Sequence, residues 1–170
     1  MTKILMVCMG NICRSPIACA IANSVAQSAG LSNHLLFDSA GTHTNHLSQR
    51  PDPRAQTALE KHGYTPVVTR SRCVTDHDFQ NFDLIVAMDL SNLAVLTCRC
   101  PPQHVSKLHL LLEFAPELGA REVPDPYHGN LAGFERVLNL CEAGVQGLIK
   151  AQIQVLQHAH PVSSHTGFRN

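Results

Sequence analysis

The stretch ILMVCMGNICRSP, residues 4–16, decides how the chain begins to fold. Its first four residues are continuously apolar, a pattern typical of a β-strand buried on both faces of a parallel sheet. Cys8 follows this run, a loop comes next, and Ser15-Pro16 opens a segment whose apolar residues recur at helical spacing. The sequence therefore predicts a strand, a loop and a helix, which together begin a βαβ unit.

The rest of the chain continues this alternation. Further strands are predicted at residues 35–37, 84–88 and 108–112. Helices are predicted after Asp52-Pro53, after a capping box of Thr75 and Asp78, after Ser91, and from Leu131 onward. This order predicts an α/β domain with a parallel sheet and helices on both faces. Ligands bind such sheets at the carboxyl edge, where the first loop and the long connection at residues 113–130 both lie.

Length, charge and cysteine content narrow the class of protein. A chain of 170 residues fits one domain, and 13 Lys and Arg against 13 Asp and Glu leave no net charge to attract nucleic acid or a membrane surface. Seven cysteines are an odd number and too few for a disulfide scaffold, which favours a reducing compartment. The apolar run at residues 4–9 is too short for a signal segment or a membrane span. We expect a cytoplasmic protein with one domain over residues 1–157 and a flexible polar tail over residues 158–170.

Cys8 and Arg14 lie at the two ends of the first loop. A loop that leads from a strand into a helix turns its backbone N–H groups toward one point and adds the positive end of the helix, which makes an anion site. Gly10 and Asn11 tolerate the positive φ that such a turn needs. The site stabilises a thiolate at Cys8, and the Arg14 guanidinium matches a tetrahedral oxyanion. The pair predicts covalent phosphoryl transfer, although alone it fits a buried cysteine and a surface arginine equally well.

Asp125 is the expected proton donor for the leaving group. It lies between Pro124 and Pro126 in the long connection, and the two prolines restrict its backbone. Rigid placement suits an acid that must reach one atom. Taken alone, this segment reads as an Asp-Pro turn, so the expectation depends on the anion site at the same sheet edge.

Residues 7–16 closely resemble the signature loop of the low-molecular-weight protein tyrosine phosphatases. The resemblance implies a flavodoxin-like, three-layer α/β/α fold with a four-stranded parallel sheet and a phosphate-binding loop after the first strand. It also implies that phosphotyrosine is hydrolysed without a metal or another cofactor. Matching segments continue in the family's order to about residue 155, and they are Asp38-Ser39-Ala40-Gly41-Thr42, Pro51-Asp52-Pro53-Arg54-Ala55, Met88-Asp89 with Ser91-Asn92-Leu93, and Asp125-Pro126-Tyr127 with Gly129.

The same resemblance implies a role for each site residue. Cys8 attacks phosphorus and forms a cysteinyl-phosphate, while Arg14 and the loop amides bind the equatorial oxygens. Asp125 protonates the leaving phenol and then acts as base toward the water that releases phosphate. Ser15 donates a hydrogen bond to the Cys8 thiolate, and Asn11 holds the turn of the loop. The implied phosphate- and substrate-binding positions are Met9, Gly10, Asn11, Ile12, Cys13, Ser15 and Tyr127.

Cys13 is the second cysteine of the loop. Members of the family use a cysteine at this place to form a reversible disulfide with the nucleophile, here Cys8, which protects it from over-oxidation. The alternative interpretation is that Cys13 contributes only its backbone amide to the loop.

The chain departs from the family at positions that bear on specificity. Asn45-His46 stand where many animal members carry an aromatic wall residue, and Tyr127-His128 replace a pair of tyrosines. We expect one aromatic wall, Tyr127, beside the substrate ring; the alternative is that this tyrosine only fixes its loop. Thr69 occupies the place of a frequent histidine, so one support of the loop is expected to differ. Asn45 and His128 favour a bacterial source, where the resemblance makes a tyrosine autokinase of polysaccharide export a plausible target.

Two other functions stay open at this point. Arsenate reductases related to this fold use the same loop with a further cysteine pair, a role for Cys98 and Cys100, but the single residue between them is short for a redox relay. A binding module is the non-enzymatic alternative, either a phosphopeptide reader or a zinc site of Cys98, Cys100, His104 and His109. This spacing is poor for zinc, and a reader does not need both a nucleophile and an acid.

Overall fold

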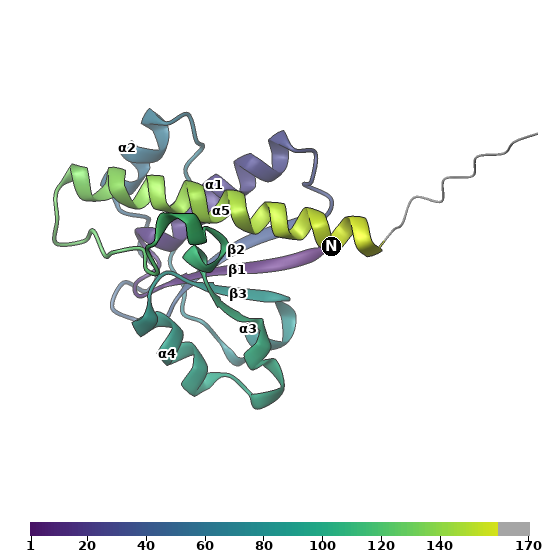
Figure 1. Cartoon of the computed structure of the whole chain (residues 1–170). Helices are drawn as coiled ribbons and strands as arrows, with labels where there is room; N and C mark the ends of the chain where they lie inside the picture. Colours follow the sequence, from purple (N-terminus) through teal and green to yellow (C-terminus); the bar gives the residue numbers. More distant parts are fainter. Residues whose placement is uncertain (160–170) are drawn as a thin grey trace, which may run out of the picture.

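A four-stranded parallel sheet with the order β2-β1-β3-β4 forms the centre of the computed structural model, which describes residues 1–159 (Figure 1). The strands are β1 (Thr2–Cys8), β2 (Leu35–Gly41), β3 (Leu84–Ala87) and β4 (Leu108–Leu110). β1 lies inside the sheet between β2 and β3. The predicted parallel sheet is confirmed, and its strand order is that of flavodoxin-like folds.

Helices cover both faces of the sheet, as the alternation predicts. α1 (Arg14–Ser28), α2 (Pro53–Lys61) and α5 (Leu131–Ala159) pack together on one face, and α3 (Asp76–Asn81) and α4 (Leu90–Arg99) lie on the other (Figure 1). Alternate side chains of β1 enter the two resulting cores: Ile4 and Met6 pack with the first group of helices, and Leu5 and Val7 with the second. Burial on both faces explains why the sequence of β1 is continuously apolar.

Short sequence motifs mark where the helices begin and end. The Asp52 carboxylate accepts a hydrogen bond of 2.8 Å from the backbone N–H of Arg54, which caps the first turn of α2. Thr75 and Asp78 form the predicted capping box of α3. Gly63 follows α2 with a φ of 77°, so the predicted stop is also in place.

Several predicted boundaries differ from the structure. β2 continues beyond its predicted end at residue 37 to Gly41, and β3 ends at Ala87 rather than at residue 88. The N-cap of α4 is Asp89, which accepts a hydrogen bond of 2.6 Å from a backbone N–H in the first turn, so Ser91 lies inside the helix. β4 ends at Leu110 rather than at Leu112, because the chain turns there into the 3-10 helix η2 (Leu111–Phe114), which packs against α5. Two more 3-10 helices, η1 (Pro102–Lys107) and η3 (Pro116–Leu118), lie before β4 and within the long connection.

α5 passes η2 so closely that no side chain fits between them at one position. A Cβ atom built on Gly147 would lie 1.8 Å from the carbonyl oxygen of Phe114. A glycine is therefore a steric requirement of this crossing.

The C-terminal end of α5 overlaps the predicted tail. The helix extends to Ala159, so the first two residues of that tail are helical. The remaining tail residues, 160–170, lie outside the described part of the chain. Within residues 1–159, no helix combines the length and the apolar character needed to cross a bilayer.

Candidate active site

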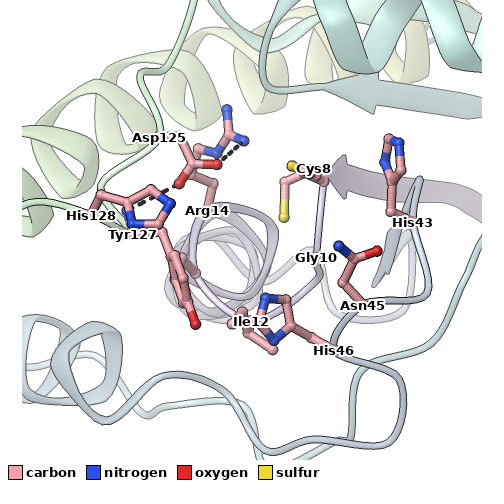
Figure 2. Close-up of a pocket in the computed structure, with 12 residues that line it drawn as sticks. Cys8, Gly10, Ile12, Arg14, His43, Asn45, His46, Asp125, Tyr127 and His128 are labelled. Atoms are coloured by element: carbon pink, nitrogen blue, oxygen red, sulfur yellow. Dashed lines mark hydrogen bonds and ion pairs between the residues drawn. The ribbon is translucent and has the colours of Figure 1, made fainter.

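The carboxyl edge of the sheet holds a cavity of about 320 Å³ (Figure 2). Its walls come from the loop after β1, the loop after β2 and the long connection, and the residues that line it are Cys8, Met9, Gly10, Ile12, Cys13, Arg14, His43, Asn45, His46, Asp125, Tyr127 and His128. The structure thus brings the predicted nucleophile, arginine and acid into one cavity from distant parts of the sequence. Of the other predicted site residues, Asn11 and Ser15 are buried next to this lining.

The loop after β1 contains one residue with a left-handed backbone, and it is closely packed at two glycines. Asn11 has a φ of 56°, as predicted, but Gly10 does not have a positive φ. Gly10 is required for space instead, since a Cβ atom there would lie 2.7 Å from Cδ2 of His46. Gly41, at the end of β2, also lacks room, because its Cβ atom would lie 2.7 Å from the carbonyl oxygen of Met9. The loop is therefore packed between the backbone of β2 at Gly41 and the imidazole ring of His46.

Cys8 lies at the bottom of the cavity, and the residue is 2% exposed. The backbone N–H of Asn11 donates to Sγ over 3.3 Å, and Oγ of Ser15 lies 3.0 Å from it. Ser15 accepts a hydrogen bond from Nδ2 of Asn11, which leaves its single proton for Sγ or for the carbonyl oxygen of Ala40. The Asn11 N–H donates to Sγ in either case, and Ser15 adds a second donor that stabilises a thiolate when its proton points to Sγ.

The Asn11 side chain connects the loop to its surroundings. Its Nδ2 also donates to Oγ of Ser39 over 2.9 Å, and its Oδ1 accepts from the backbone N–H of Arg72 over 3.0 Å. The left-handed backbone of Asn11 is energetically unfavourable. These hydrogen bonds stabilise it by joining the turn to β2 and to the segment before α3.

Arg14 begins α1 and is 2% exposed. Its Nη1 donates to Asp89 and to the carbonyl oxygen of Val123, and its Nη2 donates to Oδ2 of Asp125 over 2.8 Å. Burial acts to lower the pKa of Arg14, but negative charge at Cys8, Asp89 and Asp125 outweighs it and raises that pKa. The guanidinium therefore stays charged although it is buried.

The role of Asp89 as a partner of Arg14 was not predicted from the residues. The available signal was its position directly after the buried strand β3, at the same sheet edge as the loop. Its hydrogen bond to Asn92 caps α4, so one carboxylate both starts that helix and orients Arg14.

Cys13 lines the cavity but its thiol is held in the neutral form. It is buried, and its Sγ donates toward Oδ2 of Asp52 over 3.9 Å. Burial, with the nearby charges of Asp52 and Cys8, raises the pKa of Cys13. While Cys8 is reduced and ionised, Cys13 therefore stays a thiol.

The rim of the cavity has more rings than the single aromatic wall that the sequence predicts. Tyr127 is 38% exposed, and its ring centroid lies 5.2 Å from that of His46 and 5.1 Å from that of His128. His43 lines the same cavity. In Figure 2, His46 lies across the cavity from Asp125 and near Ile12. Tyr127 is the one Phe, Tyr or Trp side chain among the described residues that line the cavity, and the histidines add further flat faces to its rim.

Ser71, two residues after Thr69, supports the loop near the site where the sequence predicts a missing support. Thr69 is exposed, whereas Ser71 is buried and its hydroxyl donates to the carbonyl oxygen of His46. The backbones of Ser71 and Gln49 also bond, since the N–H of Ser71 donates to the carbonyl oxygen of Gln49 over 2.9 Å. Ser71 thus supports the loop that carries His46.

The cysteines considered for other functions lie away from the cavity. Cys98 is at the end of α4 and Cys100 follows it, whereas ligand loops stand at the start of this helix. Neither lines the cavity that contains Cys8. In the described part of the chain, no group of three or more His, Cys, Asp and Glu residues is placed to hold a metal ion.

Comparisons with known proteins agree on one family. The model of the family described as low molecular weight phosphotyrosine protein phosphatase matches residues 3–159. A low molecular weight protein-tyrosine-phosphatase of Streptomyces coelicolor is 38% identical over 152 residues, covering 88% of this chain and 92% of that protein. A low molecular weight phosphotyrosine protein phosphatase of Schizosaccharomyces pombe is 41% identical over 134 residues, covering 78% and 85%. A crystal structure of a protein tyrosine phosphatase from Entamoeba histolytica superposes with a TM-score of 0.88 at 40% identity, over 92% of this chain and 99% of that one.

Proposed function

The chain belongs to the low molecular weight phosphotyrosine protein phosphatase family and is a protein tyrosine phosphatase, and we propose that it works through Cys8, Arg14 and Asp125. One observation carries this assignment: the buried Cys8 sulfur shares a cavity with Arg14, and Nη2 of Arg14 donates to Asp125 over 2.8 Å. The same family match favours this reaction over arsenate reduction and over a reader without turnover.

The first step forms the covalent intermediate. The Cys8 thiolate attacks phosphorus, an S–P bond forms, and the P–O bond to the phenol breaks. Arg14 and the backbone N–H groups of residues 9–15 hold the equatorial oxygens, so they stabilise the charge of the transition state. Asp125 gives its proton to the leaving oxygen, and it exchanges its bond to Arg14 for one to that oxygen. Tyr127 packs beside the substrate ring at the rim.

The second step returns the enzyme to its starting state. Asp125, now ionised, takes a proton from a water that attacks the cysteinyl-phosphate, and inorganic phosphate leaves as the S–P bond breaks. The hydroxyl of Ser15, 3.0 Å from Sγ, donates to the departing thiolate. Ser15 therefore assists the step in which Cys8 is the leaving group.

The test of this function is p-nitrophenyl phosphate hydrolysis by the reduced protein in excess EDTA. The Cys8→Ser variant should lose turnover and keep oxyanion binding, because a serine hydroxyl at this place does not ionise. Cys98→Ser, at an exposed thiol outside the cavity, is the matched control and should keep full activity. Hydrolysis near the wild-type rate by Cys8→Ser would remove Cys8 as the nucleophile.

The regulatory role of Cys13 is part of the same proposal. Cys8 and Cys13 line one cavity, which supports a reversible disulfide between them. Peroxide should inactivate the wild-type enzyme in a way that dithiothreitol reverses, whereas recovery should be lost in Cys13→Ser. Equal recovery in both proteins would mean that Cys13 contributes only its backbone amide to the loop.

A phosphotyrosine protein of a bacterial cytoplasm is the substrate class that we propose, with a tyrosine autokinase as the candidate. Asn45 and His128 at the rim support the bacterial source, and seven free cysteines support a reducing compartment. The test is to follow loss of phosphotyrosine from a purified autokinase by immunoblot. An autokinase that stays phosphorylated while p-nitrophenyl phosphate is hydrolysed would exclude this partner.

A further inference from the structure

Arg54, in the first turn of α2, makes an unusually complete set of bonds next to the active site. Its Nε and Nη2 donate to the two carboxylate oxygens of Asp52 over 3.0 and 2.8 Å. Its Nη2 also donates to the carbonyl oxygen of Tyr127 over 3.0 Å, and its Nη1 to that of Gly129 over 3.2 Å. The guanidinium lies 4.7 Å from the ring centroid of Phe134 in α5. One side chain therefore joins α2, α5 and the segment that follows Asp125.

Asp52 connects this arginine to the phosphate-binding loop. The backbone N–H of Asp52 donates to the carbonyl oxygen of Ile12 over 2.8 Å, and its carboxylate faces Sγ of Cys13. Burial acts to raise the pKa of Asp52, but hydrogen bonds from Arg54 outweigh it and lower that pKa. The carboxylate is therefore ionised, and it links Arg54 to the loop that holds the substrate phosphate.

Residues 123–129, which we call the acid loop, are thus held on both sides of Asp125. Arg14 binds Asp125 and the carbonyl oxygen of Val123, and Arg54 binds the carbonyl oxygens of Tyr127 and Gly129. In the reaction Arg14 turns donors toward phosphate and gives up its bond to Asp125. Arg54 has no such second task, so its bonds persist when the substrate is bound.

We infer that Arg54 is a positioning residue for the general acid: it fastens the acid loop to α2 so that Asp125 reaches the leaving oxygen. This inference rests on the proposed function, because the position of Asp125 affects the rate only if Asp125 is the general acid. Arg54 is not among the residues that line the cavity. Its effect should therefore depend on how much the leaving group needs a proton.

The test measures kcat and KM for p-nitrophenyl phosphate and for phenyl phosphate in Arg54→Met and Arg54→Lys. Phenolate is the more basic leaving group and needs the acid more. We expect Arg54→Met to lower kcat for phenyl phosphate about tenfold and for p-nitrophenyl phosphate much less, with KM little changed. Arg54→Lys should recover part of this loss, because one ammonium replaces some of the four bonds. Arg50→Met, at an exposed arginine of the same segment, is the control and should match the wild type.

A double-mutant cycle with Asp125→Ala separates positioning from general loss of structure. If Arg54 acts through Asp125, Arg54→Met should cost almost nothing further once Asp125 is alanine. An equal loss in both backgrounds, or for both substrates, would overturn the inference while Asp125→Ala alone still reports on the proposed function. Circular dichroism and the melting temperature establish that each variant is folded, and Arg54→Lys carries the test if Arg54→Met is not.

Discussion

At the scale of single residues, the proposed chemistry depends on three side chains that lie at one sheet edge. Cys8, Arg14 and Asp125 were predicted to meet because the carboxyl ends of parallel strands share an edge, and they line one cavity. Asp89 and His46 were not predicted in their roles, because each reaches the site through a contact between distant segments. Local patterns carry no information about such contacts. The sequence thus predicts the place of these three groups better than it predicts the residues that contact them.

The role of Asp125 predicts a dependence on the leaving group. Asp125→Ala should lower kcat for phenyl phosphate by about 10² to 10⁴, and less for p-nitrophenyl phosphate, whose phenolate leaves with little assistance. Steady-state kinetics over a series of aryl phosphates checks this. Glu122→Ala, at an exposed carboxylate before the acid loop, is the control. A loss of the same size for every leaving group would mean that Asp125 is not the acid.

At the scale of elements, strands and helices were predicted well and their ends less well. Continuous apolar runs identified β1 and β3, and Asp52-Pro53 located the start of α2. The end of β4 was wrong because its apolar run continues into η2, and a run of apolar residues does not reveal where an extended backbone becomes helical. Packing against α5 decides that boundary.

The crossing of α5 and η2 predicts a large effect from a small substitution. Gly147→Ala should lower the free energy of unfolding by about 1–3 kcal/mol, because the new methyl group meets the carbonyl oxygen of Phe114. Gly133→Ala is the matched control in the same helix, since its nearest neighbour would be 3.6 Å away, and it should leave stability equal or higher. Urea unfolding of the three proteins checks this. Equal stability of both variants would show that η2 moves away from α5 at little cost in free energy.

At the scale of the whole molecule, Arg72 joins β2, α3 and the loop after β1. Its guanidinium pairs with Asp38 at 2.8 Å and with Asp78 of α3 at 3.0 Å, and its backbone N–H bonds to Asn11 of the phosphate-binding loop. Burial acts to raise the pKa of Asp78, but hydrogen bonds from Arg72 and Thr75 outweigh it and lower that pKa. The ionised carboxylate is therefore better stabilised in the folded protein than in the unfolded one.

This difference gives the stability of the molecule a pH dependence. A lowered folded pKa contributes stability that is present above the unfolded value of about 3.9 and is lost as the pH falls through the folded value. The free energy of unfolding should therefore fall below about pH 4, and more steeply in the wild type than in Asp78→Asn. Asp76→Asn, at a side chain that is 88% exposed in the same helix, should follow the wild type. Identical curves for the wild type and Asp78→Asn would assign the acid sensitivity to other carboxyl groups.

The start of α1 has a consequence for how this enzyme is stored and assayed. Cys13 is the N-cap of that helix and provides no side-chain cap, so the first-turn N–H groups rely on an external acceptor. A phosphate ion bound in the cavity as we propose supplies this acceptor, and any ligand that binds only the folded form shifts the folding equilibrium by mass action. We therefore expect phosphate, the reaction product, both to inhibit the enzyme competitively and to stabilise its fold. Phosphate buffers should preserve the protein during storage and lower the rate that is measured in them.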